Sequence, residues 1–81
     1  MKLEAIEETV VTCVKEVLPE AEFDSATPLE EVGMDSMNYI RLVVELEDSF
    51  GIEIQDQDIS LDNFATVAMI SQLVSRYIQH N

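Results

Sequence analysis

Three segments of the chain carry apolar residues at steps of three and four, the spacing of one buried face of an α-helix. They run from about Leu3 to Leu18, from Asp35 to Phe50, and from Thr66 to Ile78. All glycines and prolines lie between these segments, with Pro19 after the first and Gly51 after the second. The pattern therefore predicts three helices whose ends are marked by helix-breaking residues.

The connections between these helices differ in length. Residues 19–35 form a long polar stretch that we interpret as a loop, and a loop of this length in a small domain is often functional. A short fourth helix is predicted around Gln57 to Leu61. The predicted fold is all-α, a small four-helix bundle with three longer helices and one short helix. Three apolar residues are expected to anchor the long loop to the core: Phe23, Leu29 and Val32.

The length of 81 residues predicts a single domain, residues 1–81. Hydrophobic residues make up 47% of the chain, enough for a core, but no apolar run reaches the roughly 20 residues of a membrane span. The first residues lack the apolar segment of an export signal. The single cysteine, Cys13, excludes an internal disulfide and is expected in the core. We expect a cytoplasmic protein.

The chain has 17 acidic and 4 basic residues, and its formal net charge is -13. Nucleic acids and anionic membranes are bound through lysine and arginine, so this charge argues against both as partners. Proteins with basic surfaces are the expected partners of a monomeric chain. Asp56, Asp58 and Asp62 suggest a calcium loop, but the sixth and twelfth positions from Asp56 are not the glycine and glutamate of that motif, so no metal site is predicted.

The predicted helix from Asp35 to Phe50 has two apolar faces when its side chains are placed at about 100° per residue. One face is expected to enter the core: Tyr39, Leu42, Val43, Leu46 and Phe50. A second stripe, nearly opposite, has Met37 and Val44, with Ile40 between the two arcs. The charged residues around or beside it are Arg41, Glu45, Glu47 and Asp48. An apolar stripe ringed by charge is typical of a docking surface, although the bundle could also bury both faces.

Ser36 lies at the start of this helix. Serine and aspartate often cap helices, so Asp35 and Ser36 could be simple caps. A catalytic serine needs a base, and the only histidine is His80 near the end of the chain. The sequence around Ser36 also lacks the flanking glycines of a nucleophile elbow. If Ser36 has a chemical role, it is therefore expected to be modified, and the helix N-terminus would favour a phosphate there.

Residues 33–54, GMDSMNYIRLVVELEDSFGIEI, resemble the attachment site and recognition helix of acyl carrier and peptidyl carrier proteins. The resemblance extends to the length, the acidity and the helix order over nearly the whole chain. The positions that fit the pattern are Gly33, Asp35, Ser36, Met37, Leu46, Glu47 and Phe50, and the pair Glu53-Ile54 resembles the start of the next loop.

This resemblance implies a carrier rather than an enzyme. A phosphopantetheinyl transferase would join 4′-phosphopantetheine from coenzyme A to Ser36, and Asp35 would help that enzyme recognise the site. The thiol of the group would hold acyl or aminoacyl intermediates as thioesters. A loading enzyme and downstream synthase enzymes would be the other partners. The residues proposed to meet partners are Met37, Ile40, Arg41, Val44, Glu47 and Asp48. Leu46 and Ile54 match positions near an acyl cavity of some members.

Asn38 and Arg41 stand where fatty-acid carriers commonly have acidic residues, and Met37 replaces the commoner leucine. These departures favour a free-standing carrier in polyketide or nonribosomal peptide synthesis over one in fatty-acid synthesis. Two alternatives remain. One is an unmodified acidic adaptor that binds a partner through the second helix, and the other is a small calcium-binding protein.

Overall fold

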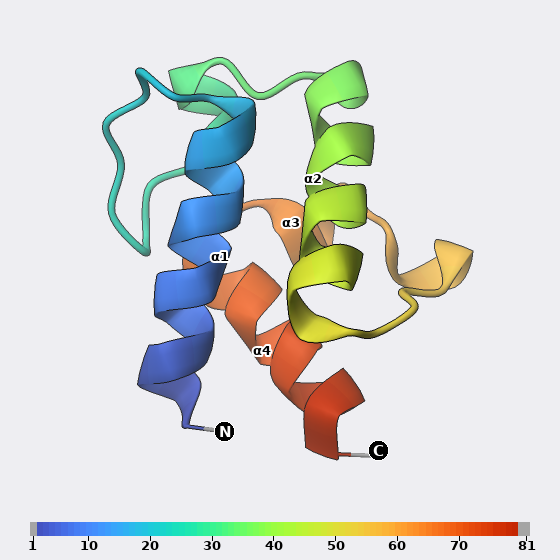
Figure 1. Ribbon diagram of the computed structural model, residues 1–81. Coiled ribbons are helices and arrows are strands. Elements are labelled where there is room, and N and C mark those ends of the chain that lie inside the picture. The colour runs from blue at the N-terminus through green and yellow to red at the C-terminus, as the bar shows by residue number, and fades with distance from the viewer. Residues whose placement is uncertain (1, 80–81) are drawn as a thin grey trace.

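The computed structural model describes residues 2–79 and contains helices only within them (Figure 1). Three helices are long and one, α3, is a single turn. Two additional 3-10 turns, η1 and η2, lie in the connections. The elements in chain order are α1 Leu3–Val17, η1 Leu29–Val32, α2 Ser36–Phe50, η2 Asp56–Asp58, α3 Leu61–Phe64 and α4 Val67–Gln79. The predicted all-α bundle of three longer helices and one short helix is confirmed.

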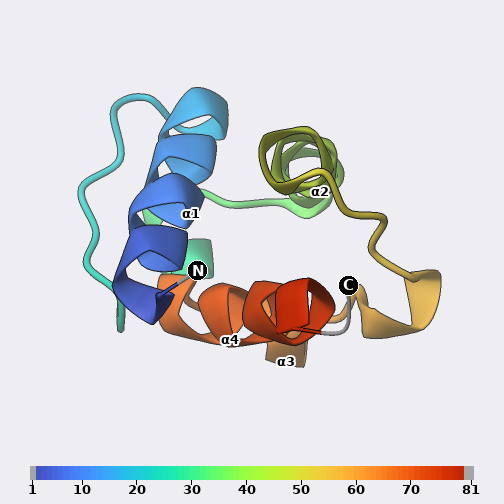
Figure 2. The ribbon, with the colours of Figure 1, turned by 60° about the horizontal axis from the view of Figure 1, so that its bottom comes forward.

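The helices α1 and α2 lie side by side and run in opposite directions, and α4 crosses the open side between them (Figures 1 and 2). Their apolar faces meet in one core, which follows from the amphipathic spacing of each helix. The central residues are Val10 and Val14 of α1, Leu42 and Leu46 of α2, and Ile70 and Val74 of α4, and none of their side chains is accessible to solvent.

The ends of α2 are set by the two residues that flank it. Asp35 is the N-cap, and its side chain accepts a hydrogen bond from the Asn38 backbone N–H. Gly51 has a φ of 65°, a left-handed conformation that glycine adopts without steric cost, and its N–H donates to the Glu47 carbonyl. The predicted limits of this helix are confirmed.

The connection between α1 and α2 is fastened to the core at Leu29, which is fully buried. The Leu29 N–H donates to the Ala65 carbonyl at 2.8 Å, and the Leu29 carbonyl accepts from Met34 N–H at 3.1 Å. Phe23 and Val32 pack against the core, so all three predicted anchors are confirmed. The 3-10 turn η1 was not predicted. Its effect is to carry the chain from this anchor to the start of α2.

The short helix predicted around Gln57 to Leu61 is wrong in position. The chain instead makes the turn η2, passes through Ile59 in an extended conformation, and starts α3 at Leu61. Ser60 caps α3 by accepting from the Asn63 N–H at 3.3 Å. The Asn63 side chain also donates to the Asp58 carbonyl at 2.9 Å, which ties the end of η2 to α3. These contacts place two short turns where one helix was expected.

Cys13 lies in the core between α1 and α2, as predicted. Its Sγ is 3.3 Å from the Ser49 hydroxyl oxygen and 3.7 Å from the Glu45 carbonyl oxygen. Burial raises the pKa of the Cys13 thiol. The thiol is therefore protonated and shielded, which makes it a structural residue rather than a reactive one.

Candidate functional site

Ser36 is the first residue of α2 and is exposed at the end of the bundle where the chain leaves the α1–α2 connection (Figure 1). Two features of the preceding residues direct the chain there. Gly33 has a φ of 103°, so it can reverse the chain after η1, and Met34 is buried against the core. The serine hydroxyl is thus presented on a rigid helix end, one residue after its cap.

Asp35 holds the first turn of α2 together. Its Oδ1 accepts from the Asn38 N–H at 2.9 Å, and its carbonyl accepts from the Tyr39 N–H at 2.9 Å. The N–H groups of Ser36 and Met37 precede the first intrahelical hydrogen bond and point out of the helix end. With the helix dipole, they favour negative charge at this end. A phosphate ester on Ser36 fits this arrangement.

We predict that Asp35→Ala destabilises the protein by about 0.5 to 2 kcal/mol, because the Asn38 N–H loses its acceptor. Asp35→Asn retains an acceptor oxygen and should keep most of that stability. Chemical denaturation of the two variants measures the difference. Equal losses in both variants would show that the charge of Asp35, and not its capping oxygen, supports the helix.

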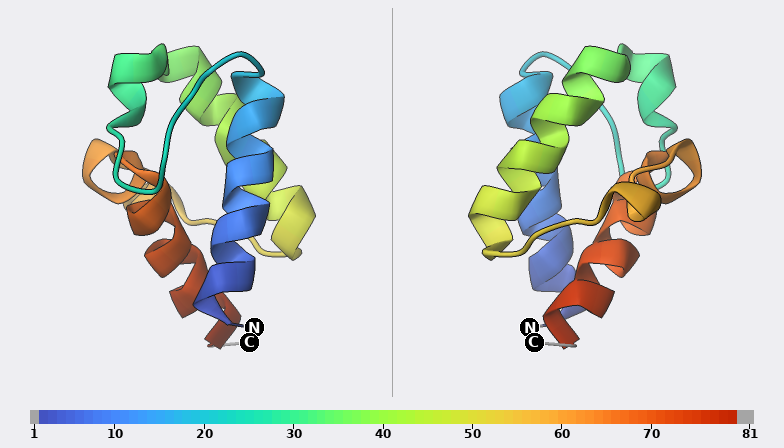
Figure 3. Two further views of the ribbon diagram at one scale, coloured as in Figure 1. Left: turned by 90° about the vertical axis from the view of Figure 1, so that its left-hand side faces the viewer. Right: turned by 90° about the vertical axis from the view of Figure 1, so that its right-hand side faces the viewer.

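No other helix lies over the outward side of α2 (Figure 3, right), and the side chains of its second apolar stripe are exposed. The solvent-exposed fractions of its side chains are 75% for Met37, 66% for Ile40 and 51% for Val44. Arg41 and Asp48 are also exposed. By contrast, Leu42 and Leu46 on the opposite side of the same helix are fully buried. The bundle therefore buries only one of the two apolar faces.

Glu47 differs from the other predicted partner-binding residues because its carboxylate serves the fold. Its Oε2 accepts from the Ile54 N–H at 2.9 Å, and the side chain is half-buried. Glu47 thereby fastens the start of the α2–α3 connection to α2. This contact links two residues seven positions apart and gives no signal in the sequence pattern.

Leu46 and Ile54, the two residues predicted near an acyl cavity, are part of the core, with exposed fractions of 0% and 5%. A cavity of about 160 Å³ is lined by other residues. Tyr39 contributes to it from α2, and the remaining lining comes from the segment that leads into and forms α3: Ile59, Ser60, Leu61 and Phe64. Tyr39 is on the same face of α2 as Leu46, as the helical spacing predicts, but its place in the lining of this cavity was not predicted.

Tyr77 fastens the other end of the α2–α3 connection. Its hydroxyl donates to Asp58 Oδ2 at 2.5 Å and accepts from the Gln55 N–H at 2.9 Å. Burial, and next the hydrogen bond to Asp58, raise the pKa of Tyr77. The hydroxyl therefore keeps its proton at neutral pH. Glu47 and Tyr77 together hold residues 54–58 against the helices.

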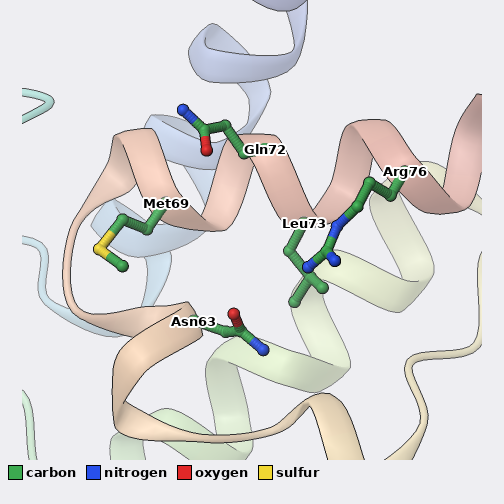
Figure 4. Close-up of a pocket in the computed structure, with 5 residues that line it drawn as sticks. All are labelled: Asn63, Met69, Gln72, Leu73 and Arg76. Atoms are coloured by element: carbon green, nitrogen blue, oxygen red, sulfur yellow. The ribbon is translucent and has the colours of Figure 1, made fainter.

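A second pocket, of about 440 Å³, lies on the surface of α3 and α4 (Figure 4). Asn63 reaches it from α3, and Met69, Gln72, Leu73 and Arg76 reach it from α4. None of the site residues predicted from the sequence lines this pocket. It is therefore separate from Ser36 and from the exposed stripe of α2.

Residues 2–79 contain neither a helix long and apolar enough to cross a membrane nor a group of three or more metal-ligating side chains. Asp58, one of the three aspartates considered for calcium, is instead bonded to Tyr77. His80 lies outside the described residues.

Comparison with known protein families matches most of this chain to one family model. Residues 8–74 correspond to the family described as the phosphopantetheine attachment site. The match includes α2 with Ser36, and it extends from within α1 into α4. It thus covers the exposed helix end, the apolar stripe and most of the core.

Proposed function

Because the chain belongs to the phosphopantetheine attachment site family, which includes the acyl and peptidyl carrier proteins, we propose that Ser36 is its attachment residue. Members of this family hold 4′-phosphopantetheine covalently on a serine. The observation that carries the proposal is the place of Ser36: exposed, first in α2, and directly after the capping Asp35. Residues 1–81 then act as one monomeric carrier domain.

Ser36 and the residues next to it would have different roles in such a carrier. The Ser36 hydroxyl provides the oxygen to which a phosphopantetheinyl transferase joins the group from coenzyme A. Asp35 fixes the first turn of α2 by accepting from the Asn38 N–H, and the first N–H groups of the helix favour the phosphate charge. The bound group supplies a thiol on which acyl or aminoacyl intermediates are held as thioesters. The chain itself has no catalytic role in this proposal.

The exposed stripe of Met37, Ile40 and Val44 starts beside Ser36 and is the proposed docking surface for partner enzymes. Arg41 and Asp48 stand exposed on the same helix and would set charge complementarity. Glu47 would contact partners at the edge of this docking surface, because one of its carboxylate oxygens already accepts a hydrogen bond from the Ile54 N–H. The expected partners are the transferase, a loading enzyme and downstream synthase enzymes.

The pathway that we propose is polyketide or nonribosomal peptide synthesis rather than fatty-acid synthesis. The support is the pair Asn38 and Arg41, which stand where fatty-acid carriers commonly have acidic residues. Arg41 is exposed beside the docking stripe, so a partner must accommodate a positive charge there. Leu46 and Ile54 lie in the core, and an acyl chain that entered the bundle would contact them there.

The test of the proposed function is the intact mass of the protein after incubation with coenzyme A and a promiscuous phosphopantetheinyl transferase. We expect a gain of one phosphopantetheine per chain. No gain in a protein shown by circular dichroism to be helical would contradict the proposal. It would leave the adaptor hypothesis, in which the same stripe of α2 binds a partner and Asp35-Ser36 is only a helix cap.

We further predict that the rate of this modification falls as salt is raised. The net charge of -13 attracts an enzyme with a basic surface over distances that salt screens, with a Debye length of about 30 Å at 0.01 M and about 3 Å at 1 M. At limiting enzyme, raising sodium chloride from 20 mM to 500 mM should slow modification by roughly tenfold. A short serine peptide of low net charge, modified by the same enzyme in place of the carrier, controls for direct inhibition of the enzyme by salt. A salt-independent rate would show that association does not depend on the acidic surface.

A further inference from the structure

The pocket between α3 and α4 carries a positive charge on an otherwise acidic chain (Figure 4). Its lining comprises one cation, two amides and two apolar side chains: Arg76, Asn63, Gln72, Met69 and Leu73. No carboxylate lines it, although acidic residues outnumber basic ones by 17 to 4 in the whole chain. This α3–α4 pocket is therefore a local site that favours a negatively charged group.

Arg76 supplies the positive charge of the α3–α4 pocket. It lies in the last turn of α4, is exposed, and forms no ion pair within residues 2–79. The planar guanidinium presents its N–H donors in a fork that matches the two oxygens of a carboxylate. The exposed amide of Gln72, one turn before Arg76, can add a further hydrogen bond. Arg76 is thus available to a carboxylate from another molecule.

The other end of the α3–α4 pocket is apolar. Met69 is 40% exposed and lies two turns before Arg76, so the two residues are about 10 Å apart along the axis of α4. Leu73, only 2% exposed, lies between them (Figure 4). Asn63 lines the pocket from α3, and its side chain is fixed by donating to the Asp58 carbonyl at 2.9 Å. The pocket therefore has a fixed wall and two chemically different ends.

The spacing of these residues determines the shape of a partner that fits them. Four of them follow one stripe of α4 at steps of three and four: Met69, Gln72, Leu73 and Arg76. A second helix lying along α4 has the same two-turn distance between its positions i and i+7. We propose that the α3–α4 pocket binds an amphipathic helix of a partner protein. That helix places an apolar side chain against Met69 and Leu73 and a carboxylate against Arg76.

This inference goes beyond the proposed function, because the α3–α4 pocket shares no residue with Ser36 or with the docking stripe of α2. A partner helix bound along α4 leaves α2 uncovered. The chain can then remain attached to one protein through α4 while enzymes bind and leave at α2. The two surfaces thus separate a lasting attachment from the exchange of enzymes.

The probe for this site is a synthetic helix of roughly 17 residues, built from alanine and glutamine and blocked at both ends. It carries a leucine at its centre and a glutamate seven positions to each side, so that either orientation along α4 can pair with Arg76. A matched peptide has lysine in place of both glutamates. Nuclear magnetic resonance titration of the wild-type protein gives the dissociation constants from the signals of Met69, Leu73 and Arg76.

We expect the glutamate peptide to bind about fivefold more tightly than the lysine peptide. The net charge of -13 predicts the opposite order, because it attracts lysine, so the observed order identifies a local contact. The titration is done at about 0.15 M salt, where a Debye length of about 8 Å screens the more distant carboxylates and leaves the contact with Arg76.

Two variants with the same change in net charge assign the preference to Arg76. Arg76→Gln should keep the fold, because the side chain is exposed, and should remove the preference for glutamate. Lys15→Gln is the matched control, since Lys15 is exposed on α1 and does not line the α3–α4 pocket. It should retain the preference. Met69→Ala should weaken the binding of both peptides, because each uses the same leucine contact.

Tighter binding of the lysine peptide, no saturable shift at millimolar peptide, or a preference that survives Arg76→Gln would each overturn the inference. Shifts at the same signals caused by raising the protein concentration alone would assign the pocket to a second copy of the chain. Saturating glutamate peptide should leave the rate of Ser36 modification unchanged, and a slower rate would contradict the separation of the two surfaces. A protein that binds the peptide but gains no phosphopantetheine would remove the proposed function and retain this inference.

Discussion

Ser36→Ala is expected to abolish attachment of phosphopantetheine completely, while leaving the fold intact. The variant removes the only atom of the side chain that can form the phosphate ester. Ser36 is exposed, and the side chain that caps α2 belongs to Asp35. The substitution therefore keeps the capping hydrogen bond of the helix. Intact mass after incubation with coenzyme A and transferase measures the loss, and thermal unfolding measures the fold.

Ser25→Ala is the matched control for this experiment. Ser25 is also an exposed serine, and its contact with α4 uses the backbone carbonyl, which accepts from the Ala68 N–H at 3.0 Å. This variant should gain one phosphopantetheine at the wild-type rate. Modification of Ser36→Ala at any rate would move the attachment to another residue, and peptide mapping of the product would locate it.

Leu46→Ala is expected to destabilise the protein by about 2 to 5 kcal/mol, because it leaves a cavity at a fully buried position of α2. Proteins of 81 residues have total stabilities of about 4 to 12 kcal/mol, so this change removes a large part of the total. Denaturation followed by circular dichroism measures the free energy of unfolding. A loss below about 1 kcal/mol would show that the core repacks around this position.

Val44→Ala is the matched control, since it truncates an apolar residue on the opposite face of the same helix, two positions away. Val44 is 51% exposed, so its loss should change stability by no more than about 0.5 kcal/mol. If Val44 contacts the transferase, the same variant should slow modification of Ser36. The pair thus assigns one face of α2 to folding and the other to docking. A Val44→Ala protein that is modified at the wild-type rate would contradict the second assignment.

The three long helices could be predicted from the sequence because each has an apolar face at helical spacing and a clear end signal. For α2, Asp35 and Gly51 mark both ends by local chemistry that does not depend on the rest of the fold. The region from Asp56 to Phe64 could not be predicted in the same way. Its turns are positioned by Tyr77, which is 19 residues from Asp58 in the sequence, and no local pattern contains that contact.

In the candidate site, too, some features could be predicted from local sequence and others depend on contacts between distant residues. The place of Ser36 and the exposed stripe of α2 follow from helical geometry, and both were predicted from residue spacing. The hydrogen bond from the Ile54 N–H to Glu47 and the burial of the Tyr39 hydroxyl depend on how segments pack in three dimensions. The prediction therefore placed Ser36 at the exposed start of α2 but did not identify the residues that line the cavity near α3.

The buried position of Cys13 has a practical consequence for a carrier. In the proposed modified form, the thiol of the attached group would be the accessible sulfur, while the chain's single cysteine is 1% exposed and held inside the bundle. A thioester on the arm would then be shielded from capture by the protein's own side chain. Maleimides and disulfide cross-linkers would also label the arm selectively, so the native sequence can be used for trapping partner enzymes without replacing its cysteine.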